Sequence, residues 1–220
     1  VREPGTPAPE GCIYDANRYA LAAQLARLGC EVGDLGIAAD RLDSVGAMLD
    51  RAVTGYDLIV SSGGMSTGEE DHVKAALEAA GGTLHAWRLA IKPGRPVALG
   101  QIGPVPFIGL PGNPVAVLVT FLRVARPLIL RLAGGREPPP HLFPVRAGFT
   151  YRKKRDRREY VRVTLADGAD GVPVASKFPR DGAGVLSSMV AADGLVELAE
   201  TVTEVAPGDS VPFLPFSEVE

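Results

Sequence analysis

This chain of 220 residues has few cysteines, a small net charge and no long uninterrupted apolar run. Its two cysteines, Cys12 and Cys30, form no CxxC pair, which argues against a thiolate metal motif and favours a reducing, cytoplasmic setting. A net charge of −3 excludes polyanion binding by bulk attraction, so any basic site must be local. The longest apolar stretch, residues 114–132, is interrupted by Arg123, Arg126 and Pro127, and a membrane span would not carry such charges at its centre.

Helix-like and strand-like segments alternate before residue 136. The spacing of apolar residues predicts helices at residues 15–28, 42–55, 71–80 and 114–132. Short apolar or β-rich runs predict strands at residues 31–37, 58–60, 83–89, 97–99 and 107–108. This alternation predicts an α/β fold with a doubly wound, mostly parallel sheet. Ligands of such sheets bind beyond the carboxyl ends of the strands.

The pattern changes at the three prolines of residues 138–140, which form a stiff spacer. Beyond them no helical period is convincing, and short β-rich segments follow one another between Gly, Pro and Asp. These segments are residues 160–165, 172–175, 195–198 and 210–214. We therefore predict two domains, an α/β domain over residues 1–136 and a small all-β domain, barrel-like or a sandwich, over residues 137–220.

The first candidate binding loop, SSGGMSTGEED at residues 61–71, lies between a predicted strand and a predicted helix. Its hydroxyls, its glycine amides and the positive end of the helix suit an anion. The acids at residues 69–71 suggest a bridging Mg²⁺ or a proton acceptor. A glycine turn followed by an acid-rich first helical turn explains the same residues without a ligand.

The second candidate loop, residues 87–96, places Arg88, Lys92 and Arg95 in a segment stiffened by Pro93 and Pro96. Arginine suits bidentate contact with an oxyanion, and lysine acts as a point charge. A solvated turn is the alternative interpretation, but long cations do not need a rigid segment to reach water.

The third candidate loop, GLPGNP at residues 109–114, has Asn at the N-cap and Pro at the first position of a predicted helix. The exposed N–H groups of that first turn suit a phosphate or carboxylate, although capping alone explains the motif. Together, the three loops predict a pocket for a phosphorylated small molecule.

Four segments of the chain, in order, carry a family resemblance: IYDANR at 13–18, SGGMSTGEED at 62–71, AIKPGRP at 90–96 and GLPGNP at 109–114. They resemble the molybdopterin molybdenumtransferases, the MoeA type also found as the E domain of gephyrin. REYVRV at 158–163 and GVLSSM at 184–189 resemble the family's small β domain. The resemblance implies a molybdopterin-binding α/β domain followed by a β-barrel-like domain.

The resemblance also implies a function. The family inserts molybdenum from molybdate into adenylated molybdopterin and releases AMP in molybdenum cofactor biosynthesis, with a divalent cation, Mg²⁺ or Zn²⁺, and as a homodimer. A molybdopterin adenylyltransferase is the alternative enzyme, although it would lack the β tail. A non-catalytic molybdopterin-binding or scaffold fragment is the alternative of another class. Neither a membrane nor a nucleic acid is an expected partner.

Individual residues take roles by this resemblance. Asp71, Lys92 and Arg88 are implied as catalytic residues, with Arg88 standing where the family usually has lysine. Asp71 and Asp40 are implied as metal ligands. The implied substrate-binding residues are Ser62, Gly63, Gly64, Ser66, Gly68, Arg95, Pro111, Gly112, Asn113 and Pro114.

The chain departs from the family at its start. The family's α/β domain opens with a strand ending in a TGDE-like segment, whereas this sequence begins with VREPGTP, after the place of that strand. Two N-terminal domains of the family would also precede it. Either the 220 residues are a fragment of a longer protein, or the protein has lost part of its site.

A nucleic-acid surface is a third class of function, based on the basic run at residues 152–158. The run lacks interleaved aromatic residues apart from the flanking Tyr151 and Tyr160. A solvated β-hairpin tip is therefore the preferred interpretation of this run.

Overall fold

The computed structural model describes residues 1–64, 72–136 and 138–219. The contacts of the chain divide it into two compact units. The first unit is Val1–Leu89 with Pro96–Phe121, and the second is Ala90–Arg95 with Leu122–Glu220. The predicted domain boundary after residue 136 stays a prediction, and each unit is described by itself.

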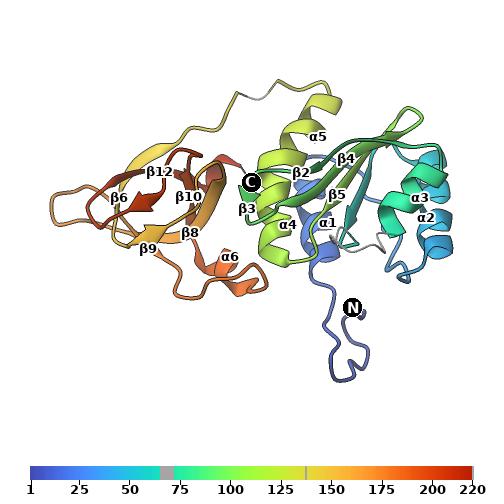
Figure 1. Ribbon diagram of the computed structural model, residues 1–220, viewed down its shortest axis with the longest axis horizontal. Helices are drawn as coiled ribbons and strands as arrows, with labels where there is room; N and C mark the ends of the chain where they lie inside the picture. The colour runs from blue at the N-terminus through green and yellow to red at the C-terminus, as the bar shows by residue number, and fades with distance from the viewer. Residues whose placement is uncertain (65–71, 137, 220) are drawn as a thin grey trace. The chain divides into compact units, whose positions relative to one another are not determined.

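A four-stranded sheet with the order β1-β5-β4-β2 forms the centre of the first unit (Figure 1). Its strands are β1 (Ile59–Ser62), β2 (Thr83–Arg88), β4 (Pro96–Ile102) and β5 (Val105–Leu110). β1 and β5 are parallel, whereas β4 is antiparallel to both β5 and β2. The described sheet is thus mixed, and the prediction of a mostly parallel sheet was wrong for these strands.

Short connections explain the antiparallel pairs. β4 and β5 are joined by a two-residue turn in which Gly103 adopts a φ of +54°, so Ile102 lies opposite Val105. Such a turn connects only antiparallel strands, because a parallel pair needs a crossover of a dozen or more residues. The connection from β2 to β4 is also too short for a crossover. Sequence periodicity located these strands but not their directions.

The strand predicted at residues 31–37 is absent, and this segment has no regular secondary structure. The Asp34 side chain accepts a hydrogen bond from the backbone N–H of Gly36 at 2.9 Å. Gly36 adopts a φ of +83°. A side chain that bonds to nearby backbone offers the chain an alternative to a strand, which is the physical reason for the difference.

All four helices predicted for this part of the chain are present. They are α1 (Asn17–Arg27), α2 (Leu42–Gly55), α3 (His72–Ala79) and α4 (Pro114–Thr120). Figure 1 shows α2 and α3 together on one side of the sheet and α1 with α4 on the other. Leu49 and Leu77 of the first pair pack with Phe107 of the sheet in one buried cluster. Helices therefore cover both faces of the sheet, as in other α/β folds.

Local hydrogen bonds and one glycine define the two ends of α1. The Asp15 side chain accepts a hydrogen bond from the N–H of Arg18 at 3.1 Å. Gly29 adopts a φ of +79°, and the N–H of Cys30 then bonds to the carbonyl of Leu25 at 3.1 Å. The left-handed conformation of a glycine after the last turn is the usual way to end a helix.

Replacing Gly29 by alanine is expected to lower the free energy of unfolding by about 1 kcal/mol, because the left-handed conformation is unfavourable for a side chain. No atom lies within 4 Å of the added methyl group, so the cost is conformational. The matched control is Gly46→Ala inside α2, where the methyl group also meets no atom within 4 Å. That change should raise stability by about 0.5–1 kcal/mol. Equal effects of both substitutions in urea unfolding would contradict the expectation.

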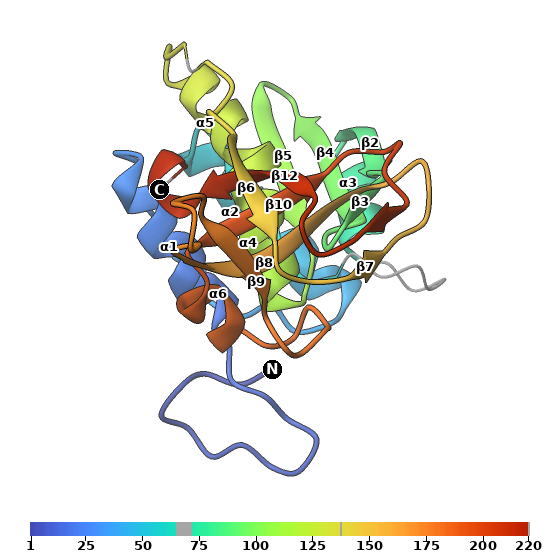
Figure 2. The ribbon, with the colours of Figure 1, turned by 90° about the vertical axis from the view of Figure 1, so that its left-hand side faces the viewer.

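The second unit contains a closed five-stranded barrel with the order β10-β12-β6-β9-β8, in which β8 pairs with β10 (Figure 2). Its strands are β6 (Phe143–Ala147), β8 (Arg158–Ala166), β9 (Val174–Lys177), β10 (Gly194–Leu198) and β12 (Ser210–Pro215). The prediction of a barrel-like domain is confirmed. Sequence reasoning missed β6 and the short helix α6 (Ser187–Ala191).

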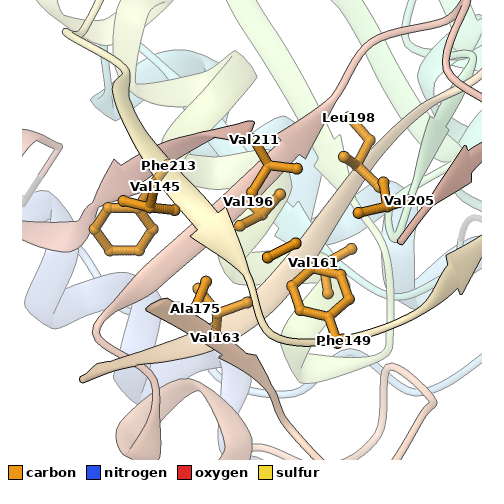
Figure 3. Packing of buried hydrophobic residues seen from close by; sticks show 11 residues of the cluster. Val145, Phe149, Val161, Val163, Ala175, Val196, Leu198, Val205, Val211 and Phe213 are labelled. Carbon is orange, nitrogen blue, oxygen red and sulfur yellow. The ribbon is translucent and has the colours of Figure 1, made fainter. Parts of the chain in front are cut away.

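Alternating apolar residues of the barrel strands fill its interior (Figure 3). Val161 and Val163 of β8 meet Val196 of β10 and Phe213 of β12 there. Two shorter strand pairs extend the unit: β3 (Ile91–Lys92) runs parallel to β8, and β7 (Tyr151–Arg152) pairs with β11 (Glu204–Val205). The second unit is thus built around one apolar core inside the barrel.

The helix predicted at residues 114–132 is present as three consecutive elements. A π-helical turn, η1 (Phe121–Ala125), separates α4 from α5 (Arg126–Leu132). Pro127 lies in the first turn of α5 and has no N–H to donate to the preceding turn, which accounts for the interruption. None of the helices formed by the described residues has the length and hydropathy needed to cross a membrane.

Candidate functional site

Two of the three candidate loops of the sequence leave the first sheet side by side. Ser62, the last residue of β1, is the parallel partner of Leu110, the last residue of β5. The N–H of Gly63 donates to the carbonyl of Leu110 at 3.0 Å. A methyl group added to Gly112 would lie 3.7 Å from the Cα atom of Gly63. The two loops therefore meet at the carboxyl edge where the sequence predicted them.

Asn17, the first residue of α1, ties these two loops together. Its Nδ2 atom donates to Ser62 Oγ at 2.9 Å and to the Gly112 carbonyl at 2.7 Å. Ser62 Oγ in turn donates to the carbonyl of Pro111 at 3.0 Å. The sequence analysis included Asn17 in the segment IYDANR but predicted no role for this residue. Its only sequence signal was its place in IYDANR, because its partners are 45 and 95 residues away.

The backbone of the first loop requires glycine. Gly63 and Gly64 adopt φ angles of +85° and +71°. A methyl group on Gly64 would also lie 2.6 Å from Val73 Cγ2 of α3. Gly64 is exposed, so its peptide is open to a ligand that approaches this edge.

The third loop begins α4 as predicted, with one difference. Asn113 occupies the N-cap position and Pro114 the first helical position, but the Asn113 side chain forms no cap hydrogen bond. Pro111 is buried, whereas Gly112 and Asn113 are exposed. The amide of Asn113 thus remains available at the edge beside Ser62.

Some predicted residues lie outside the described part of the chain. These are Ser66, Gly68 and Asp71, and their roles stay predictions. Within β1, the Oγ atom of Ser61 is buried and has no hydrogen-bond partner among the described residues.

Arg88 lies at the same sheet edge as Ser62 and Leu110. It ends β2, which runs antiparallel to β4, which in turn runs antiparallel to β5. The order β1-β5-β4-β2 separates Arg88 from β1 by three strand spacings, roughly 14 Å. Its side chain is exposed. The edge therefore carries hydroxyl and amide groups at one end and a cation at the other.

Asp40, a predicted metal ligand, is exposed just before α2. Among the described residues, no group of three or more His, Cys, Asp or Glu is placed to hold a metal ion. The described residues alone therefore do not make a metal site, and Asp71 lies outside them. The two aspartates stay predicted ligands.

Lys92 belongs to the second unit, where β3 places it opposite Glu159 of β8. Its Nζ atom lies 3.3 Å from Tyr151 Oη and 3.3 Å from Glu159 Oε2. Arg95, also in this unit, is exposed. The convergence of Lys92 with the loops of the first unit stays a prediction. Sequence reasoning missed both partners of Lys92, which are 59 and 67 residues away in the chain.

Glu159 is a buried anion with three partners. Tyr151 donates to its Oε2 atom at 2.7 Å, and Arg157 Nε donates to Oε1 at 2.9 Å. Burial raises the pKa of Glu159, but hydrogen bonds from Tyr151 and Arg157 and the charge of Lys92 outweigh burial, so the pKa is lowered overall. Burial and the bond to Glu159 raise the pKa of Tyr151. At neutral pH the cluster therefore holds an ionised Glu159 and a neutral Tyr151.

The basic run at residues 152–158 is mostly engaged within the barrel unit. Arg152 pairs with Glu204, and Arg157 with Glu159. Arg158 binds Glu197 and Glu200, while the Lys153 ammonium donates to backbone carbonyls. Four of its six cations thus have internal partners, so the feature that suggested a nucleic-acid surface is largely part of the barrel's own structure.

Comparison with known proteins shows the family. Residues 5–131 match the family model described as a probable molybdopterin binding domain. The chain belongs to this family. Residues 144–216 match a second model, the MoeA C-terminal region, domain IV. The predicted domain boundary falls between the two matches. The molybdopterin-binding domain contains the sheet edge with Ser62 and Gly112. The barrel belongs to the C-terminal region.

Relatives of the same kind match along both domains. The chain is 35% identical over 219 residues to a molybdopterin molybdenumtransferase of Haemophilus influenzae, covering 99% of the chain and 54% of that protein. It is 36% identical to molybdopterin molybdenumtransferase 2 of Mycobacterium tuberculosis, covering 94% and 52%. The solved structure of a molybdopterin biosynthesis MoeA protein from Pyrococcus horikosii superposes with a TM-score of 0.80 at 32% identity, covering 98% and 51%. The chain spans about half the length of these relatives.

Proposed function

We propose that this chain forms the substrate-binding half of a molybdopterin molybdenumtransferase. In this reaction molybdenum from molybdate is inserted into adenylated molybdopterin, and AMP is released. The observation that carries the proposal is the pair of loops after β1 and β5, which Asn17 ties together at the edge of a molybdopterin-binding domain. The barrel unit favours this enzyme over an adenylyltransferase, because it matches the MoeA C-terminal region.

The proposed substrates are anions, and the groups at the edge suit them. The Gly64 peptide and the Asn113 side-chain amide offer hydrogen-bond donors to the terminal phosphate of the pterin. Ser62 and Gly63 shape the loop instead, because they already donate to the carbonyls of Pro111 and Leu110. Arg88, Lys92 and Arg95 are the proposed cations for the diphosphate-like link and for molybdate. These groups bind and orient the substrates so that the bond to the adenylate is held in place for cleavage.

Other parts of the proposal come from the family resemblance. Mg²⁺ held by Asp71 and Asp40 would polarise the adenylate bond. The described residues by themselves supply no complete ligand set for it. A homodimer and a cytoplasmic location complete the proposal.

Release of AMP tests the proposed function. Purified chain mixed with adenylated molybdopterin should release AMP when molybdate is added, and AMP is measured by chromatography. The matched control omits molybdate. Binding of adenylated molybdopterin without AMP release would contradict the catalytic assignment and favour a binding or scaffold module. Absence of binding would overturn the proposal entirely.

A further inference from the structure

A half-exposed lysine of the proposed site contacts a fully buried carboxylate of the barrel. The side chain of Lys92 is 53% exposed, whereas that of Glu159 is 1% exposed. An ionised carboxylate is costly to bury unless its partners compensate for the lost hydration. Glu159 meets this requirement by binding Tyr151, Arg157 and Lys92 together. The carboxylate therefore has a fixed position from which it can hold the lysine.

The backbone of Lys92 is fixed to the same strand of the barrel. β3 runs parallel to β8 with Lys92 opposite Glu159. The N–H of Arg158 donates to the carbonyl of Ala90 at 2.9 Å. The segment AIKPGRP is thus attached to the barrel by backbone pairing, and Glu159 stands directly beside the lysine that the segment presents.

We propose that Glu159 and Tyr151 are positioning residues, which hold the Lys92 ammonium in one place for an anionic substrate. The inference rests on the proposed function and deepens it, because it assigns to the barrel the task of orienting a cation of the binding site. Neither residue is proposed to contact the substrate.

Geometry supports a positioning role for both residues. A free lysine side chain samples many rotamers, and an anion that binds it must pay the loss of this freedom. Lys92 Nζ already has two oxygen partners at 3.3 Å and lies 5.7 Å from the centre of the Tyr151 ring. Tyr151 is fixed in turn by its hydrogen bond to Glu159. The ammonium is therefore ordered before a ligand arrives.

The charges of the cluster leave attraction for an anion. Lys92 and Arg157 share the single negative charge of Glu159, so one positive charge is uncompensated. Asp181 also interacts electrostatically with Lys92, but it is hydrogen-bonded to Lys177 at 2.8 Å. Without Arg157, the lysine and the glutamate would neutralise each other. Positioning thus does not cancel the charge that the substrate needs.

Three variants test the proposal in the full chain. Tyr151→Phe removes one hydroxyl group, and Glu159→Gln removes the buried charge. Glu197→Gln is the matched control, because Glu197 is also buried in the barrel and pairs with Arg158 and Arg123 but not with Lys92. Thermal unfolding of all three variants reports the structural cost of each change separately from the effect on Lys92.

The side-chain ammonium of Lys92 is observed directly by ¹⁵N NMR. The chain has only five lysines, and the Lys92→Gln variant assigns the signal. We expect hydrogen exchange of this ammonium to become several-fold faster in Tyr151→Phe and Glu159→Gln, because its oxygen partners are lost or misplaced. Exchange in Glu197→Gln should stay as in the parent chain, even if that variant is equally destabilised.

Affinity for adenylated molybdopterin is the second measurement. Kd should rise by about threefold to tenfold in Tyr151→Phe and in Glu159→Gln, the range expected for one hydrogen bond, and should not change in Glu197→Gln. Unchanged exchange at Lys92, or faster exchange with an unchanged Kd, would overturn the positioning role. If the parent chain itself does not bind adenylated molybdopterin, the proposed function fails, and the positioning role for that substrate fails with it. The hydrogen-exchange rates of the Lys92 ammonium would still show whether Glu159 and Tyr151 order this lysine.

Discussion

Replacing Lys153 by methionine is expected to lower the free energy of unfolding of the second unit by about 3 kcal/mol. The Lys153 residue is 9% exposed, and its ammonium donates to the carbonyls of Val202 at 2.7 Å, Ala199 at 2.9 Å and Lys154 at 3.2 Å. Methionine keeps an unbranched apolar stem but offers no donor. The substitution therefore removes a buried ammonium and its bonds to the half-buried residues Ala199 and Val202. The Val202 carbonyl loses the 2.7 Å donor, whereas the Ala199 carbonyl still accepts from the Val202 N–H; an acceptor left unsatisfied where water cannot enter costs about 1–3 kcal/mol.

Urea unfolding measured by circular dichroism checks this expectation through the shift of the midpoint. The control is Lys154→Met, which removes the same charge from the next residue, an exposed side chain with no ion pair among the described residues. That change should alter stability by less than about 0.5 kcal/mol. Equal stability of the two variants would show that the carbonyl contacts of Lys153 contribute nothing to stability. Lys153 would then behave like an exposed, solvated lysine.

Replacing Asn17 by alanine is expected to raise Kd for adenylated molybdopterin by about tenfold to a hundredfold, with a stability loss of only about 1–2 kcal/mol. Asn17 Nδ2 is the donor that joins Ser62 Oγ to the Gly112 carbonyl. Without it the loops after β1 and β5 lose the two hydrogen bonds made by Asn17 and keep only those from Ser62 Oγ and the Gly63 N–H, so they can shift relative to one another. A displacement of about 1 Å in a binding site is enough for an effect of this size.

Two further variants make the result specific to the link. Asn17→Asp is nearly isosteric, but an ionised carboxylate only accepts hydrogen bonds, so this change should weaken binding at least as much as alanine does. Gln24→Ala, on the same helix, removes an amide with no side-chain hydrogen bond among the described residues and should leave Kd unchanged. Isothermal titration of the parent chain and the three variants measures these effects. A Kd unaffected by either change at Asn17 would remove this residue from the site.

Much of the fold followed from sequence patterns that act over short distances. The apolar spacing of Leu42, Val45 and Leu49 predicted α2, and Gly55 ends it. The three-residue apolar run before Ser61 predicted β1, and Asn113-Pro114 predicted the start of α4. Helical periodicity and capping are properties of neighbouring residues, so a single sequence contains them.

Strand direction and side-chain pairing did not follow from such patterns. The sequence could not show that Gly103-Pro104 turns the chain back into an antiparallel hairpin, because apolar strands look alike in either direction. Asp34 likewise prevents a strand through a bond that no periodicity records. Within the candidate site, Asn17, Tyr151 and Glu159 were missed because each acts through residues distant in the chain.

The sequence by itself determined the two-part organisation, the family resemblance and the residue types that suit an anion: glycines, hydroxyls and three cations in stiff loops. These depend on local composition and order, which the chain carries without folding. Only the tertiary structure decided that Asn17 bonds to two loops at once, that most cations of the basic run are paired within the barrel unit, and that Lys92 lies beside a buried carboxylate. Each of these depends on the distance between groups far apart in the chain, and that distance exists only once the core has packed.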